Sequence, residues 1–136
     1  ALLFMPMWAA AQTVTSFTVV NTDTGADIAT FTSSGSVSII NTPNINVRAN
    51  ASGVNSVVFT DGKTSRTENN APYAYKSDVG GRYNKWSPVA GTYYIHAKPF
   101  SGSRGRGVAG AVATLTLTIT DGSTPTPTPV PAPTSV

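Results

Sequence analysis

Strict alternation of side-chain type is the feature that most constrains this chain. Residues 113–120 read Ala-Thr-Leu-Thr-Leu-Thr-Ile-Thr, so apolar and hydroxyl side chains alternate with the period of a β-strand. The apolar side chains are predicted to face a core, and the threonines to face water. No segment of the chain shows helical periodicity, so the alternation predicts a sheet with one wet face.

The same strand signal recurs along the chain, with turn residues between the segments. The predicted strands cover residues 14–20, 36–40, 45–49, 56–60, 73–75, 92–98 and 113–120. In 92–98, Tyr93, Ile95 and Ala97 alternate with Tyr94, His96 and Lys98. Asp61-Gly62 and Asp121-Gly122 are strong turn signals. About seven strands in one domain predict an all-β fold, an immunoglobulin-like antiparallel β-sandwich.

The composition is typical of an extracellular β-protein. Charged residues make up 11% of the 136 residues, well below the roughly 25% of ordinary soluble domains. The sequence has no cysteine, so packing must hold the fold without disulfides or thiolate metal sites. The formal net charge is +3, and the basic residues form no stripe of the kind that binds nucleic acid. No nucleic-acid partner is predicted.

The chain is predicted to have three parts. Residues 1–11 read ALLFMPMWAAA, and an apolar run followed by small residues is typical of the end of a secretory signal peptide. This run is too short for a membrane span, which needs about 20 residues. Residues 12–122 are predicted to form the sandwich. Residues 123–136 read STPTPTPVPAPTSV and predict an extended linker or tail, so the protein is expected to be secreted, extracellular or at the cell surface.

Two kinds of glycosylation site are predicted. Asn50-Ala51-Ser52 is an N-glycosylation sequon, a triplet that also arises by chance. The Thr-Pro repeats of the tail suit O-glycosylation, with the acceptors Thr124, Thr126 and Thr128.

Residues 56–100 carry a recognisable arrangement. Ser-Val-Val-Phe-Thr-Asp-Gly at 56–62 is followed by Ala-Pro-Tyr at 71–73 and by Gly-Thr-Tyr-Tyr-Ile-His-Ala at 91–97. This pattern resembles the bacterial immunoglobulin-like modules of secreted carbohydrate-active enzymes and cell-surface proteins. The resemblance implies a sandwich fold and an extracellular setting. It implies no catalytic activity, because such modules act as spacers, adhesive units or binding accessories.

The residues themselves predict no catalytic or metal centre. The single histidine, His96, lies in mid-strand, where packing or surface exposure is favoured over a role as general base. Nothing places two of the six acids across a cleft, as a glycosidase requires. Asn21, Asp23, Gly25 and Asp27 resemble a calcium loop but lack its closing glutamate, so they are interpreted as a turn. The chain is predicted to be no enzyme and to need no metal or other cofactor.

The first functional prediction is a non-catalytic structural subunit of an extracellular filament or surface assembly. An open sheet edge can accept a strand from a neighbour, and such a head-to-tail contact builds a homopolymer because it does not close. Pro6 weakens this prediction, because it lacks the N–H of a paired strand. The predicted donor residues are Leu2, Leu3, Phe4, Trp8, Val14, Phe17 and Val19.

The alternative prediction is a carbohydrate-binding or spacer module of a larger secreted enzyme. Aromatic residues gather late in the chain, at Tyr73, Tyr75, Tyr83, Trp86, Tyr93, Tyr94 and Phe100. A core position is favoured for most of these rings. Tyr83 and Trp86, in a glycine-rich segment, are predicted to stack on a polysaccharide.

Overall fold

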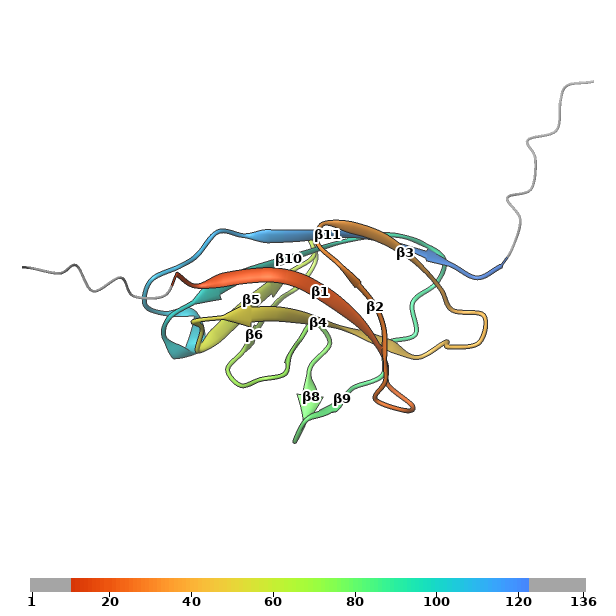
Figure 1. Ribbon diagram of the computed structural model, residues 1–136, viewed down its shortest axis with the longest axis horizontal. Coiled ribbons are helices and arrows are strands. Elements are labelled where there is room, and N and C mark those ends of the chain that lie inside the picture. Colours follow the sequence, from red (N-terminus) through yellow and green to blue (C-terminus); the bar gives the residue numbers. More distant parts are fainter. Residues whose placement is uncertain (1–10, 123–136) are drawn as a thin grey trace, which may run out of the picture.

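Two sheets pack face to face in the computed structural model, which describes residues 11–122 (Figure 1). The first sheet is antiparallel and has the order β2 (Asp27–Phe31), β1 (Thr13–Asn21), β4 (Ile45–Ser52) and β7 (Tyr73–Ala74). The second has the order β3 (Ser34–Ser38), β11 (Ala113–Thr120), β10 (Gly91–Phe100), β5 (Ser56–Thr60) and β6 (Ser65–Glu68). The result is an all-β, β-sandwich-like fold.

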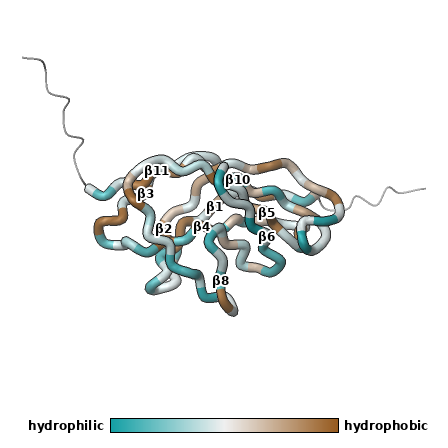
Figure 2. Tube along the Cα trace, turned by 180° about the vertical axis from the view of Figure 1, so that it is seen from behind, coloured by the Kyte–Doolittle hydropathy of each residue, from teal (hydrophilic) through white to brown (hydrophobic). Residues whose placement is uncertain are grey.

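Smaller elements lie outside these sheets. The strands β8 (Asp78–Val79) and β9 (Arg82–Tyr83) form a short hairpin that projects away from the sheets (Figure 1). The tip of this hairpin is hydrophobic (Figure 2), and Val79 is 74% exposed. A single 3-10 turn, η1 (Ser103–Gly105), follows β10.

All seven predicted segments form strands; those at 56–60 and 113–120 have the predicted bounds, and the other five have shifted ends. Four further strands, β2, β6, β8 and β9, raise the number among the described residues to eleven. All four are short: β2 and β6 each form the edge of a sheet, and β8 and β9 pair only with each other. The sequence 27–38 carries no long alternation, so it predicted one strand where the chain forms two.

The predicted antiparallel sheet needs one correction, at β3. This strand pairs in parallel with β11, from Ser34 beside Thr116 to Ser38 beside Thr120. The chain leaves the edge of the first sheet after β2 and joins the edge of the second, so β3 runs in the direction of β11. Gly35 is required there, because a Cβ would lie 2.2 Å from the ring of Phe31.

The core forms between the two sheets, as the alternation predicts. From the second sheet, Ile95, Ala97, Leu115, Leu117 and Ile119 are buried. From the first sheet, Phe17, Val19, Val47 and Ala49 pack against them in one hydrophobic cluster. Each large apolar side chain buried in this way contributes about 1.5–3 kcal/mol, which stabilises a domain without disulfides.

The N-terminal strand belongs to this core. β1 lies between β2 and β4, and Phe17 pairs with Phe31 on one side and Ala49 on the other. Phe17 and Val19 have no exposed surface, and Val14 packs against the same cluster. These three predicted donor residues therefore complete their own sheet and form no free donor strand. The other four predicted donor residues, Leu2, Leu3, Phe4 and Trp8, lie outside the described residues.

Candidate functional site

A row of aromatic rings runs from the core to the surface at one end of the second sheet. Phe59 and Tyr75 have ring centroids 6.1 Å apart. Tyr75 and Trp86 are 5.3 Å apart with planes at 84°, and Trp86 and Tyr93 are 5.1 Å apart at 87°. Edge-to-face contacts of this kind are favourable. The main chain of Trp86 is also fixed, because its N–H and carbonyl both bond to Ile45 at 2.9 Å.

The row opens into a cleft of about 340 Å³, which we call the Trp86 cleft. Its walls come from the turn after β5, the segment after β7, and the first residues of β10. The lining residues are Asp61, Lys63, Tyr75, Lys76, Trp86, Thr92, Tyr93 and Tyr94. A smaller hollow of about 290 Å³ adjoins the cleft along Ser65 and Arg66 and shares Tyr75 and Lys76 with it.

Asp61 is the one carboxylate that lines the Trp86 cleft, and its oxygens are in use. It accepts hydrogen bonds from the Tyr75 hydroxyl at 2.6 Å, from the N–H groups of Lys63 and Thr64 at 2.9 and 2.8 Å, and from the Thr64 hydroxyl. Burial by itself would raise the pKa of Asp61, but these bonds outweigh burial and hold that pKa well below its usual range. Asp61 is therefore an ionised, structural turn residue.

Tyr75 and Asp61 form a hydrogen-bonded pair. Burial raises the pKa of the Tyr75 hydroxyl well above the usual value, and the hydrogen bond to the Asp61 carboxylate raises it further. The hydroxyl therefore stays protonated and donates to Asp61. Neither member of the pair is poised to exchange a proton near neutral pH.

Lys76 is held in the cleft with its charge facing two rings. Its Nζ lies 4.6 Å from the centroid of Tyr75 and 5.6 Å from that of Trp86. Its main chain is fixed by the fully buried Asn46, whose Oδ1 accepts from the Lys76 N–H at 3.0 Å. Asn46 Nδ2 donates to the carbonyls of Ser77 and Asn84, both at 3.0 Å. The loop that carries Lys76 is thus tied to β4.

Tyr94 provides the exposed ring beside the cleft. The Tyr94 side chain is 55% exposed and lies on the outer face of β10, opposite Thr116 of β11. Its neighbours on this face are hydroxyl residues, with Thr92 opposite Thr118 and Thr116 opposite Ser34. A ring among hydroxyl groups offers one apolar surface and many hydrogen-bonding groups.

No protein-family model matches the chain, and no curated protein or solved structure does either. Its function is therefore inferred from its own geometry.

The structure separates the two rings predicted to bind a polysaccharide. Trp86 lines the cleft described above, half-buried between Tyr75 and Tyr93. Tyr83 lies in β9 and lines a different cleft, with Thr22, Asp23 and Arg82 among others. The sequence prediction missed Tyr94, Lys63 and Lys76 as parts of the site. The outward position of Tyr94 in the alternating segment 92–98 was the signal that could have found it.

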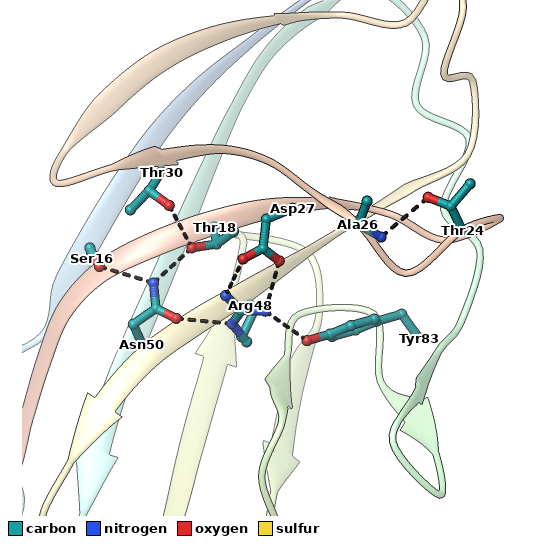
Figure 3. Close-up of polar contacts among 9 residues, drawn as sticks. All are labelled: Ser16, Thr18, Thr24, Ala26, Asp27, Thr30, Arg48, Asn50 and Tyr83. Atoms are coloured by element: carbon teal, nitrogen blue, oxygen red, sulfur yellow. Dashed lines mark hydrogen bonds and ion pairs between the residues drawn. The ribbon is translucent and has the colours of Figure 1, made fainter.

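Tyr83 belongs to a hydrogen-bond network on the outer face of the first sheet (Figure 3). Arg48 donates to both carboxylate oxygens of Asp27 at 3.1 and 3.2 Å, to Asn50 Oδ1 at 2.9 Å, and to the Tyr83 hydroxyl at 3.0 Å. The hydrogen bond to Asp27 raises the pKa of Arg48. Every member of this network has a partner, so it is a structural feature.

The predicted N-glycosylation site is part of the same network. Asn50 Nδ2 donates to Ser16 Oγ at 2.9 Å and to Thr18 Oγ1 at 2.8 Å (Figure 3). A glycan on this nitrogen would replace one of these bonds, so the folded structure disfavours modification at Asn50. The predicted O-glycosylation sites Thr124, Thr126 and Thr128 lie outside the described residues.

The remaining titratable residues form no further centre. His96 Nδ1 is 2.8 Å from Thr114 Oγ1 on the sheet surface. In the loop compared with a calcium site, Asp27 pairs with Arg48, and Asp23 accepts from Asn44 and pairs with Lys85. Residues 11–122 contain no group of three His, Cys, Asp or Glu side chains that could hold a metal. Within the same range, no helix is long and apolar enough to span a membrane.

Proposed function

We propose that this chain is a non-catalytic, extracellular module that binds a polysaccharide at the Trp86 cleft. The observation that carries the proposal is a cleft that Trp86 and Tyr93 line together with Tyr94, whose side chain is more than half exposed. Binding sites commonly combine apolar, aromatic walls with a few placed polar groups. A sugar ring fits this chemistry, because it has an apolar face and a rim of hydroxyl groups.

The fold supports an immunoglobulin-like module as the finer description. In the second sheet, β11, β10 and β5 are neighbours in that order. An immunoglobulin domain has the same arrangement, because one of its sheets places the second-last strand between the last strand and the third strand. The β4 strand lies in the opposite sheet and β1 pairs with it in antiparallel fashion, as the first two strands of such a domain do. The hydroxyl-rich composition supports the extracellular setting, and the lack of cysteine does not argue against it.

The absence of a second carboxylate among the cleft-lining residues supports a non-catalytic role. Glycoside hydrolysis uses two carboxyl groups that flank the bond to be cleaved. Asp61 is the sole acid lining the cleft, and its oxygens accept bonds from Tyr75 and the turn. A bound polysaccharide is therefore expected to be released unchanged.

The test is retention of the purified chain on a panel of polysaccharides, by affinity gel electrophoresis and isothermal titration calorimetry. Tyr94→Ala is expected to weaken binding about tenfold or more, on the scale of the 1–3 kcal/mol that stacking on an aromatic ring contributes to base recognition. Tyr83→Ala is the matched control, because this ring lines a different cleft. Equal retention of Tyr94→Ala and the unmodified chain would overturn the choice of site, and no retention on any polysaccharide would overturn the proposed function.

An apolar groove favours a second function, self-association into a filament. The groove has a volume of about 590 Å³ and is lined by residues 11–14 and 108–113, mainly alanine and valine. Val108 and Val112 are 65% and 54% exposed. The apolar residues 1–10 of a neighbouring copy would match such a surface, in place of the strand donation by residues 12–20 that the structure disfavours.

Sedimentation velocity tests this second function. The full chain is expected to associate as its concentration rises, and Val112→Asp is expected to keep it monomeric by placing a charge in the groove. A full chain that stays monomeric at every concentration overturns the filament hypothesis and leaves the binding module.

A further inference from the structure

We infer that the Trp86 cleft selects an acidic polysaccharide, whose carboxylate or sulfate group is bound by Lys63 and Lys76 while a sugar ring stacks on Tyr94. This inference rests on the proposed function and narrows it to one class of ligand. The distribution of charge around the cleft supports it, and that distribution depends on the fold.

The charged residues of the cleft leave it with a net positive charge. Two ammonium groups and one carboxylate line it. The carboxylate, Asp61, is directed to the Tyr75 hydroxyl and to the turn at Lys63 and Thr64. The ion pairs among residues 11–122 are Arg48 with Asp27, Arg66 with Glu68, and Lys85 with Asp23. Neither lysine of the cleft is in one of them.

Lys76 is prepared to bind an anion. Its ammonium group lies against the rings of Tyr75 and Trp86, whose faces attract a cation but carry no negative charge. The Asn46 side chain fixes the main chain of Lys76, so part of the ordering cost of binding is already met. A ligand carboxylate or sulfate would add charge-assisted hydrogen bonds to the cation–π contact.

The other basic residues near the cleft indicate that the ligand has a single localised acidic group at this site. Arg66, in the adjoining hollow, is paired with Glu68 at 2.6 Å. Lys98 lies four residues beyond Tyr94 on β10, over the ring of Phe100. Two lysines beside one exposed ring match a repeating sugar with one anionic group per ring. A nucleic-acid site would need a continuous basic stripe along the backbone of the ligand.

Affinity electrophoresis and calorimetry of the full chain with four probes test the inference. Polygalacturonate and alginate carry carboxylates, chondroitin sulfate carries sulfate as well, and xylan is the neutral probe. We expect binding to the acidic probes that weakens as salt rises from about 0.01 M to about 0.15 M, because the Debye length falls from about 30 Å to about 8 Å. Retention by the uronate polymers or by the sulfated polymer then identifies which anion is preferred.

Substitutions that each remove one lysine charge test whether the acidic group binds at this cleft. Lys63→Gln and Lys76→Gln are each expected to weaken binding of the acidic probes about tenfold, with unchanged far-ultraviolet circular dichroism. Lys98→Gln is the matched control, since it removes the same charge near the far end of β10 and is expected to change affinity less than about twofold.

The possible outcomes separate the inference from the function on which it rests. Binding to xylan that Tyr94→Ala abolishes, with no effect of salt or of the two lysine substitutions, would overturn the acidic ligand and leave the polysaccharide-binding module intact. No binding to any of the four probes would overturn both. An oligothymidylate serves as an additional competitor, and its preferential binding over the acidic sugars would overturn the ligand class.

Discussion

The outer face around Arg48 and the Trp86 cleft use similar polar groups in opposite ways. Around Arg48, the guanidinium group donates to Asp27, Asn50 and Tyr83, so most of its N–H groups already have an acceptor within the fold (Figure 3). In the cleft, Lys63 and Lys76 have no carboxylate partner within residues 11–122. A set of polar groups that satisfy one another stabilises the fold, whereas cations without an anion are available to bind one.

The difference follows from where each group lies in the sheet. The register of β1 on β4 places Thr18 beside Arg48 and Ser16 beside Asn50. These residues share one face of two long strands, so their partners are set by the ladder. Lys63 and Lys76 lie in connections after β5 and β7, where no ladder supplies a partner.

Removal of the Arg48 side chain is the strongest test of this comparison. Arg48→Ala should lower the free energy of unfolding by about 2 kcal/mol, mainly through lost hydrogen bonds to Asn50, Tyr83 and Asp27, since an exposed ion pair contributes little by itself. Urea denaturation measures the change. Arg82→Ala removes an exposed arginine of the β9 hairpin and should cost less than about 0.5 kcal/mol. Equal costs would show that the network does not stabilise the fold.

Substitution of Asp61 tests whether the carboxylate of the cleft stabilises the fold. Asp61→Asn should cost about 1.5 kcal/mol at pH 7, because the bonds from Tyr75, Lys63 and Thr64 lose their charge assistance. The matched control is Asp78→Asn, which affects a carboxylate that accepts one bond from the Gly81 N–H.

The pH dependence of stability gives a second readout for Asp61. Its pKa is lower in the folded chain than the value of about 3.9 in an unfolded chain, so the unfolded state binds the proton first as pH falls. The stabilisation is therefore complete above about pH 5 and is lost as pH falls below about 4. Thermal melts from about pH 5 down to about pH 2 should show a smaller loss in Asp61→Asn than in the unmodified chain, and an identical loss would contradict the assignment.

The Tyr75 hydroxyl should contribute less than Asp61, since it supplies one of several bonds. Tyr75→Phe is expected to lower the free energy of unfolding by about 1 kcal/mol while keeping the ring row. Combined with Asp61→Asn, the total cost should fall short of the sum of the two single costs, because both substitutions remove the same bond. Additive costs in urea denaturation would show that the two side chains act independently.

The smallest expected effect is the most informative about the cleft. Lys63→Gln should change the free energy of unfolding by less than about 0.5 kcal/mol. Lys76→Gln should cost no more than about 1 kcal/mol, the loss of a partly exposed cation–π contact. Thermal melts at neutral pH check both. A cost near that of Arg48→Ala would show that the lysines serve the fold and would end the contrast between the two surfaces.

The sequence by itself determined where most strands form and which side chains face the core. Leu115, Leu117 and Ile119 are buried as their alternation predicts, and Asp61 serves a turn as its Asp-Gly pair predicts. These properties are local, because side-chain period and turn chemistry depend on neighbours in the chain. Local sequence patterns therefore predicted the strands, the buried side chains and this turn.

Only the tertiary structure decided which of these strands and side chains meet. It set the parallel pairing of β3 with β11, gave Asn50 its partners on β1, and separated Tyr83 from Trp86. It also brought Lys63 and Lys76 to one cleft from connections thirteen residues apart in sequence. The physical reason is that register and sheet assignment depend on contacts distant in sequence, and the period of a single strand contains no information about its partner.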